Sequence, residues 1–394
     1  MSLAGQDITI LGAGIGGLTA ARALALRGAR VRIVEQAAVL REVGAGVQIS
    51  PNGAVVLRAL GLGAALDAVS TRAVAVELRD GTSGRLVTRL DVARLRPEQG
   101  YHFLHRADLI TLLGDAARDS GVEILLQNRV GRVDLSGACP ALIMADGQVR
   151  SVPTLIGADG LHSPVRAALT GVVAPFFTHQ TAWRAVIAGD PADAAVAEVH
   201  MAPGRHLVSY PLRGGTLRNI VAVEQRRGWT DESWSLRGDP AELRHGFRGF
   251  APKVRGWLDR VDEVGLWGLF RHPVAKQWHR ILPQGSVAIL GDAAHPTLPF
   301  LAQGASIALE DAWVLAHNLD TMDLPTALGD YQSSRILRTS RVVEAANRNA
   351  RTYHLGGTKR IIGHAVMRLG GAIAPSLALR RFDWLYGLDV TQQD

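Results

Sequence analysis

The chain of 394 residues has a single cysteine, Cys139, and only three lysines. One thiol excludes an internal disulfide and a thiol pair for redox chemistry, and it indicates a protein of the reducing cytoplasm. Arginine therefore supplies nearly all of the 43 basic residues behind the formal charge of +7. Because these arginines are dispersed and form no basic block, we expect no nucleic-acid partner.

Long apolar runs and metal-ligand clusters are also missing. No stretch of 18 uncharged apolar residues occurs, and the start, MSLAGQDITILGAG, lacks the basic region and cleavage site of a signal peptide, so we expect no membrane span. His102 and His105, like His200 and His206, have no cysteine partner or acidic cluster at ligand spacing, so we expect no metal site. The remaining composition, 47% hydrophobic and 20% charged, is typical of a globular protein of two or three domains.

The first 36 residues have the pattern of a β-α-β unit. A short apolar strand at 7–14 leads into a helix at 17–28, and a second strand follows at 29–36. This order is typical of the opening of a Rossmann-type fold, in which the turn after the first strand holds a dinucleotide.

That turn carries the glycines which the binding geometry needs. Gly12 permits the turn, Gly14 lets a pyrophosphate approach the backbone, and Gly17 lets helix and strand pack closely. Glu35 ends the second strand, where a carboxylate can accept hydrogen bonds from a ribose. The predicted dinucleotide contacts of this unit are Gly12, Ala13, Gly14, Ile15, Gly16, Gly17, Glu35 and Gln36.

Two later strands also end in an acidic turn. VPTLIGADGLHSPVRAAL, residues 152–169, is a strand that closes on Asp159 and passes into a helix, and SVAILGDAAHP closes on Asp292. Pro296 and Pro299 are expected to hold the following loop extended before a helix restarts near Gly304. Two such strand ends are more than a simple NAD dehydrogenase needs.

The three motifs in this order resemble the signatures of the single-component (group A) FAD-dependent aromatic monooxygenases. The likeness covers nearly the whole chain, and the LAQGA form of the last motif is most similar to salicylate, 3-hydroxybenzoate and 6-hydroxynicotinate hydroxylases. It implies an α/β fold like that of para-hydroxybenzoate hydroxylase, with a Rossmann-type FAD-binding domain, an inserted mixed β-sheet substrate domain and C-terminal helices.

The resemblance also implies an activity. FAD would be the cofactor and NADH or NADPH the reductant, and dioxygen would hydroxylate a small phenolic or hydroxypyridine-type acid through a flavin hydroperoxide. A helix that starts at Gly304 would aim its free N–H groups at the flavin's pyrimidine edge. Another FAD-dependent oxidoreductase on the same fold, or a non-catalytic FAD-binding protein, stays open.

Further flavin contacts follow from the resemblance, position by position. The segment 42–52 resembles the one that lies along the isoalloxazine, and HRADL matches the family's flavin-binding arginine, although Ile110 replaces a histidine common in relatives. Asp292 would accept hydrogen bonds from the ribityl hydroxyls. The additional predicted contacts are Arg41, Val47, Arg106, Val130, Asp159, Asp292, Gly304 and Ala305.

The substrate pocket is expected between the inserted sheet and the loop at 296–303. His206 and Tyr210 lie four residues apart in GRHLVSYPLR, so on a strand they face the same side. By the resemblance, they would hydrogen-bond the substrate's phenolic oxygen and help to remove its proton. The residues predicted to act on or to enclose the substrate are His206, Tyr210, Gln303, Phe300 and Trp183, and the role of Arg184 stays open.

The motifs and the period-2 stretches predict a discontinuous domain plan. The FAD-binding domain is expected at 1–70, 101–175 and 280–330, the substrate domain at 71–100 and 176–279, and a C-terminal helical segment at 331–394. In that segment, helical spacing continues to about residue 353, and one or two short helices are expected in the tail. The protein is expected to be a monomer or a homodimer.

Overall fold

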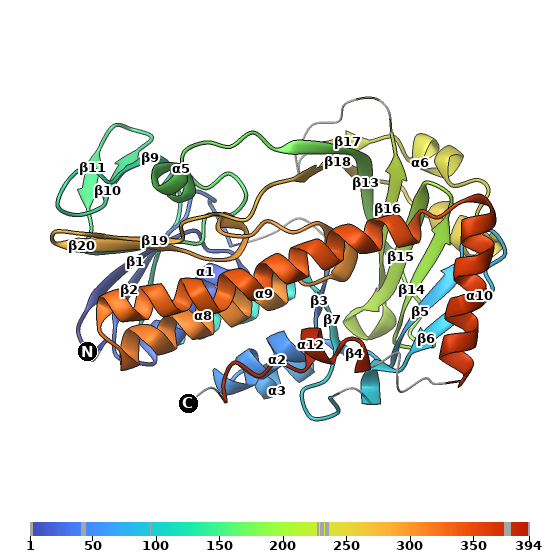
Figure 1. Ribbon diagram of the computed structural model, residues 1–394, viewed down its shortest axis with the longest axis horizontal. Helices are drawn as coiled ribbons and strands as arrows, with labels where there is room; N and C mark the ends of the chain where they lie inside the picture. The colour runs from blue at the N-terminus through green and yellow to red at the C-terminus, as the bar shows by residue number, and fades with distance from the viewer. Residues whose placement is uncertain are drawn as a thin grey trace.

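The structure is a computed structural model, and it describes residues 3–40, 45–94, 96–226, 228, 232, 236–373 and 380–392. Two large β-sheets form its framework (Figure 1). The long helix α9 (Leu324–Tyr353) runs past both of them.

Six strands form the first sheet, in the order β19-β20-β12-β1-β2-β8. All neighbours are parallel except β19, which is antiparallel to β20. Buried apolar residues dominate the central strands β1, β12 and β20, as in Ile8, Ile10 and Leu11, because helices cover both faces of a parallel sheet. The strands are β1 (Asp7–Leu11), β2 (Arg30–Val34), β8 (Glu123–Leu125), β12 (Thr154–Gly157), β19 (His279–Leu282) and β20 (Gly285–Ile289).

Eight strands form the second sheet, in the order β17-β18-β13-β16-β15-β14-β5-β6. It is mixed, because β14 pairs with β5 in parallel while the other neighbours are antiparallel. The strands are β5 (Ala75–Asp80), β6 (Leu86–Leu90), β13 (Phe176–Ala188), β14 (Val196–Ala202), β15 (Arg205–Leu212), β16 (Leu217–Gln225), β17 (Arg237–Gly238) and β18 (Val264–Arg271).

Two three-stranded sheets complete the described strands. One joins β9 (Val130–Asp134), β10 (Ala141–Met144) and β11 (Val149–Ser151). The other has the order β3-β7-β4 and joins β3 (Gly46–Ile49), β4 (Thr71–Arg72) and β7 (His102–His105).

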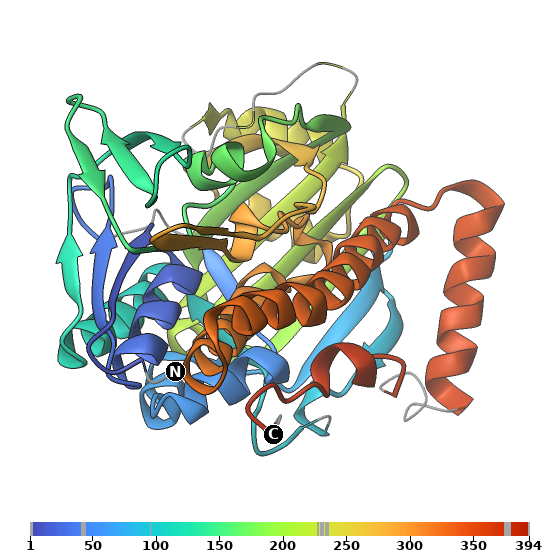
Figure 2. The same cartoon turned by 60° about the vertical axis from the view of Figure 1, so that its left-hand side comes forward.

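Helices cover the sheets and connect them. Figures 1 and 2 show α8 lying along the first part of α9, while the rest of α9 continues past the eight-stranded sheet. Among the residues that the structure describes, the α-helices besides α9 are α1 (Ile15–Ala25), α2 (Pro51–Ala59), α3 (Gly63–Val69), α4 (Arg106–Asp119), α5 (Pro164–Thr170), α6 (Pro240–Gly246), α7 (Pro252–Leu258), α8 (Gly304–Thr321), α10 (Gly357–Ile373) and α12 (Asp383–Tyr386).

The predicted α/β fold with an inserted mixed sheet and C-terminal helices is confirmed. The strands of the six-stranded sheet come from 7–34, 123–157 and 279–289, and those of the eight-stranded sheet from 75–90 and 176–271. The division into separate domains stays a prediction. In the tail, α10 with its 17 residues is longer than the short helices expected. Across the described ranges, no helix is long and apolar enough to cross a membrane.

Candidate active site

Of the three glycines predicted to shape the turn after β1, only Gly14 leaves room for a ligand. Gly12 has a φ of +102°, and a Cβ there would lie 2.4 Å from the carbonyl oxygen of Ala158. A Cβ on Gly17 would lie 2.0 Å from the carbonyl oxygen of Gly12. A Cβ on Gly14 would meet nothing within 4 Å, because Gly14 borders an open cavity. Two glycines thus close the turn, and the third leaves space for a diphosphate against the backbone, so these residues fit a dinucleotide.

Glu35 lies against the same turn. Its carboxylate accepts hydrogen bonds from the backbone N–H groups of Ala13, at 2.7 Å, and Ala37, at 2.8 Å. Gln36 beside it is exposed. The contact of Glu35 with a ribose stays a prediction.

The end of β20 places an acidic side chain in the cavity. The chain turns through a short 3₁₀ helix, η3 (Gly291–Ala293), whose Asp292 borders the cavity. The side chain is exposed toward the cavity but lies deep inside the molecule, and this burial raises its pKa, against the effects of His295, Arg106 and His272. Arg106, the first residue of α4, borders the same cavity, and burial lowers its pKa against the effect of Asp292. An acid and a cation therefore face the space where the ribityl chain is expected.

The loop after Asp292 brings a helix start to the cavity. The expectation of an extended loop is wrong at Pro299, which begins the 3₁₀ helix η4 (Pro299–Leu301), because its fixed φ suits the first position of a helical turn. Ala302 then has a left-handed φ of 52°, and α8 begins. Gly304 and Ala305 border the cavity. The first N–H groups of a helix have no partner within it, so they can donate to a ligand here.

Another wall of the cavity is formed by β3, which carries Val47. Gly46 holds this strand against the eight-stranded sheet, because its N–H donates to Oδ1 of Asn219 at 2.8 Å. A Cβ on Gly46 would lie 2.6 Å from the hydroxyl oxygen of Tyr210. The segment expected along the isoalloxazine is therefore packed directly against the expected catalytic tyrosine.

Gly14, Val47, Arg106, Asp292 and Gly304 border one cavity of about 370 Å³, which continues beneath the eight-stranded sheet. There, mostly apolar residues line it together with two side chains of β15, His206 and Tyr210, while Gln48, Glu232 and Thr297 also border the cavity. The apolar residues there are Val208, Val221, Val223, Trp267, Leu269, Leu298 and Phe300. The structure thus brings His206, Tyr210 and Phe300 to the same cavity as the dinucleotide turn.

The side chains of His206 and Tyr210 differ in whether they can accept a proton at neutral pH. Burial, and then the neighbouring His354, lower the pKa of His206 well below its usual range, so its ring is neutral. Burial raises the pKa of Tyr210, against the effect of a hydrogen bond with Gln48, so its hydroxyl keeps its proton at neutral pH. The neutral ring of His206 can therefore accept a proton, whereas the protonated hydroxyl of Tyr210 cannot act as a base but can donate a hydrogen bond.

Trp183 is not part of the cavity wall, so this prediction is wrong. It is fully buried on the other face of the eight-stranded sheet, where it packs with Leu207 and Phe247. Successive residues of a strand face opposite sides, so the neighbouring Ala182 packs with Phe300 on the cavity side. Arg184, the other neighbour, lies over the ring of Trp267, at 5.4 Å from its centroid.

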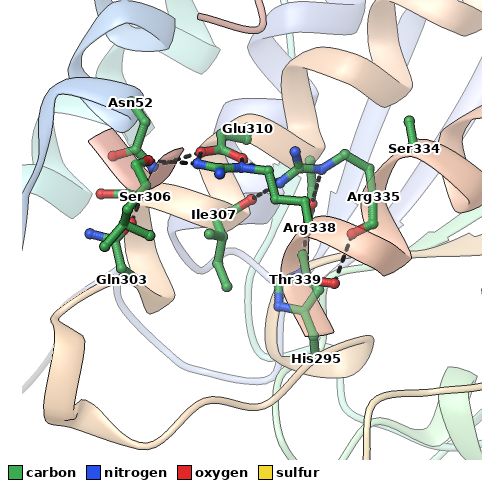
Figure 3. Close-up of polar contacts among 12 residues, drawn as sticks. Asn52, His295, Gln303, Ser306, Ile307, Glu310, Ser334, Arg335, Arg338 and Thr339 are labelled. Atoms are coloured by element: carbon green, nitrogen blue, oxygen red, sulfur yellow. Dashed lines mark hydrogen bonds and ion pairs between the residues drawn. The ribbon is translucent and has the colours of Figure 1, made fainter. Parts of the chain in front are cut away.

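Gln303 borders the cavity, but its amide does not point into it. The amide nitrogen donates to Oγ of Ser50 at 2.8 Å, and the amide oxygen accepts from Nδ2 of Asn52 at 3.1 Å. Figure 3 shows Gln303 beside Ser306 and near Asn52. Both ends of the amide are occupied by Ser50, which precedes α2, and Asn52, which belongs to it, so the expected substrate contact of this side chain is wrong.

Two other predicted contacts, Asp159 and Val130, do not border this cavity. Asp159 does not border it: its Oδ2 accepts from the N–H of Val165 at 3.2 Å, and burial raises the pKa of this carboxyl to about 6. Val130 begins β9 and packs on the main core instead. Arg41 lies outside the described residues.

A buried ion network beneath the cavity was not predicted (Figure 3). Arg335 of α9 contacts both Glu310, at 2.6 Å, and Asp311, at 2.8 Å, on α8. Asp311 Oδ2 also accepts from the N–H of Gly291 at 3.0 Å and contacts the ring of His295. The network therefore fixes the turn that carries Asp292 to the helix that begins at the cavity. In the sequence, only the adjacent acids Glu310 and Asp311 of ALEDA indicate this network. No local pattern identifies Arg335 as their partner.

Three separated strand ends meet around a ligand-sized cavity, which has an open backbone position at Gly14. This geometry defines the class as a dinucleotide-binding protein with a second ligand site in the same cavity. Residues 6–346 match the FAD binding domain family, and the chain belongs to it. The described residues contain no group of three or more His, Cys, Asp or Glu placed to hold a metal.

Relatives along nearly the whole chain identify the branch of the family. The chain is 33% identical to 3-hydroxybenzoate 6-hydroxylase of Polaromonas naphthalenivorans (strain CJ2) over 396 residues, 97% of this chain and 96% of the relative. It is 36% identical to 3-amino-4-hydroxybenzoate 2-monooxygenase of Streptomyces cremeus over 356 residues, 88% of each. A salicylate hydroxylase solved as a substrate complex shares the fold, with a TM-score of 0.80 and 24% identity over 98% of this chain and 97% of the other. The resemblance inferred from the motifs is confirmed, and the protein is a FAD-dependent monooxygenase.

Proposed function

We propose that the protein hydroxylates a small phenolic aromatic acid, using FAD, NADH or NADPH, and dioxygen. One observation carries this proposal: the cavity that Gly14 borders is also bordered by His206 and Tyr210 among mostly apolar side chains. The two hydroxylase relatives, whose names specify hydroxybenzoates, support this substrate class. FAD, when bound, supplies hydride acceptance from the nicotinamide and the activation of dioxygen.

The residues of this chain then prepare the substrate. His206, held neutral, accepts the phenolic proton, and the hydroxyl of Tyr210 donates a hydrogen bond to the same oxygen. A phenolate ring is richer in electrons than a phenol, so its carbon is attacked more readily by an electrophilic oxygen. The apolar walls, such as Phe300 and Val223, exclude water from the reacting ring.

The dinucleotide end holds the cofactor. Gly14 accommodates the diphosphate, Arg106 and Asp292 face the ribityl chain, and the N–H groups at Gly304 face the pyrimidine edge. We further infer a cytoplasmic protein that is a monomer or a homodimer. Light scattering on the purified protein measures its oligomeric state.

The test is a ligand panel on the FAD-loaded protein. 3-Hydroxybenzoate, salicylate and 6-hydroxynicotinate are compared with benzoate, which has the same carboxylate but no hydroxyl for His206 and Tyr210. We expect at least one phenolic or hydroxypyridine acid to stimulate NADH or NADPH oxidation severalfold and benzoate to leave it at the basal rate. If benzoate stimulates as strongly as every hydroxylated acid, phenol activation by these residues is wrong.

A further inference from the structure

His206 has a partner from the C-terminal segment. Its Nδ1 lies 2.8 Å from Nε2 of His354, and the two ring centroids are 5.0 Å apart. Both histidines are buried, with 2% and 9% of their surface exposed. His354 immediately follows α9, so a helix that starts beside the six-stranded sheet ends at the substrate end of the cavity.

This bond fixes what each nitrogen of His206 can do. Nδ1 is occupied by His354, so Nε2 is the ring nitrogen left for a substrate oxygen in the cavity that His206 borders. Two neutral imidazoles can share one such bond in either direction, because each has one donor and one acceptor nitrogen. In the arrangement where Nδ1 of His206 donates, its Nε2 has a free lone pair and can act as a base.

The far side of the pair approaches the surface. Nδ1 of His354 is buried and has no hydrogen-bond partner among the residues that the structure describes. The backbone carbonyl of His354 accepts from the N–H of Gly204 at 3.3 Å, in the turn between β14 and β15 whose Pro203 is exposed. The pair therefore extends from the cavity toward a surface turn.

We propose that His354 is a positioning residue that holds His206 in its basic form and passes the substrate's proton onward. This rests on the proposed role of His206. The phenolic O–H bond breaks as an N–H bond forms at Nε2 of His206. The proton on Nδ1 of His206 moves to Nε2 of His354, and the proton on Nδ1 of His354 leaves to water. The products are a phenolate and a hydronium ion, and no electrons are transferred.

The groups that face the pair disfavour a proton that stays there. Arg205 of β15 is the charged neighbour that, after burial, lowers the pKa of His354 to about 4. Tyr353 of α9 lies with its ring centroid 5.1 Å from that of His206, and burial raises its pKa to about 12, so it carries no charge at neutral pH. Phe300, on the third side of His206, is apolar. A proton that reaches His354 is therefore passed on rather than held.

The test separates proton transfer from packing. His354→Gln keeps an acceptor oxygen near the position of Nε2 but cannot pass a proton on, whereas His354→Leu removes both functions. His364→Gln is the matched control, because His364 is a buried histidine of α10 that contacts Asp80 instead of the cavity. Each FAD-loaded variant is mixed with 3-hydroxy-4-nitrobenzoate, whose phenol and phenolate differ in visible absorbance, and ionisation of the bound ligand is followed by stopped flow.

We expect His354→Gln to bind the probe within about twofold of the wild type but to ionise it at least about 10-fold more slowly, as for loss of a proton-transfer partner. His354→Leu should lose affinity as well, and His364→Gln should match the wild type in both readings. If His354→Gln ionises the probe at the wild-type rate, the relay is wrong. This holds even if the variant has a lower melting temperature, because that change would show a role in packing alone. A wild type that neither binds nor ionises any phenolic acid contradicts the proposed function itself.

Discussion

Gly14 shows how one absent side chain makes a site. A Cβ at this position meets no protein atom within 4 Å, so a larger residue is tolerated by the fold but occupies the space for the diphosphate. We predict that Gly14→Val leaves the protein folded and colourless, with FAD content near zero. The measurement is the absorbance of the purified protein near 450 nm together with its far-UV circular dichroism.

Gly249→Val is the control for this substitution. Gly249 is exposed, and a Cβ on it also meets nothing within 4 Å, but it borders no cavity that contains the dinucleotide turn. This variant should keep its FAD. Equal FAD content in both variants would remove Gly14 from the binding site.

Tyr210 tests the chemistry at the same scale. Its buried hydroxyl keeps its proton, so it is placed to stabilise a phenolate by donating a hydrogen bond. Tyr210→Phe should keep FAD but lower hydroxylation about 10²-fold, with much of the consumed NADH appearing as hydrogen peroxide. Product and peroxide are measured in the same reaction. Turnover at the wild-type rate and coupling would make Tyr210 a packing residue only.

His206, Tyr210 and Trp183 show which residue-level predictions sequence allows. The first two share a face because a strand repeats every two residues, and this pattern is local. Which face meets the cavity is decided by the helices α6 and α7, which cover the other side with Phe247 and its neighbours. Trp183 faces those helices, and no pattern within β13 gives this information.

At the scale of elements, α8 connects the cavity to the ion network. Its first residues border the cavity, and its second turn carries Glu310 and Asp311, both fully buried. Burial alone would raise the pKa of Asp311, but His295 and Arg335 lower it to about 2. The folded-state pKa therefore lies below the unfolded value of about 3.9. The charge of Asp311 stabilises the fold above about pH 4, and this contribution is lost as the pH falls toward 2.

We predict that Asp311→Asn lowers the free energy of unfolding at pH 7 by about 3–5 kcal/mol, because Arg335 is left buried without one of its two acids. Urea unfolding at several pH values measures this, and the difference from the wild type should shrink as the pH falls from 4 to 2. Asp330→Asn, an exposed change on α9, should have little effect. If the difference in the free energy of unfolding between Asp311→Asn and the wild type stays constant down to pH 2, it does not originate in the ion pair.

The elements divide into those that sequence predicts and those that it does not. The glycine turn, the turns that follow β12 and β20 and the start of α8 have local signatures, and all four stretches border the cavity. The partners of α8 are on α9, and the partner of His206 is at residue 354, 148 positions further along the chain. Long-range pairs of this kind leave no mark in spacing or periodicity.

At the scale of the whole molecule, α9 links the two large sheets. Its first half anchors α8 through Arg335, and its last turn packs Ala350 with Phe300 and Val223. Figure 1 shows the helix running between these regions. Cofactor and substrate ends of the cavity are thereby held in one arrangement, which ring hydroxylation requires because both ligands must meet within bonding distance.

The most direct test of a ring-hydroxylating monooxygenase is the origin of the oxygen in its product. The FAD-loaded protein is supplied with NADH or NADPH, the phenolic acid that stimulates it most and ¹⁸O₂, and the product is analysed by mass spectrometry. We predict an aromatic product that carries one ¹⁸O atom, formed by the wild type and strongly reduced in Tyr210→Phe. Nicotinamide oxidation that yields only hydrogen peroxide, or a product whose new oxygen comes from water, would contradict ring hydroxylation at this site.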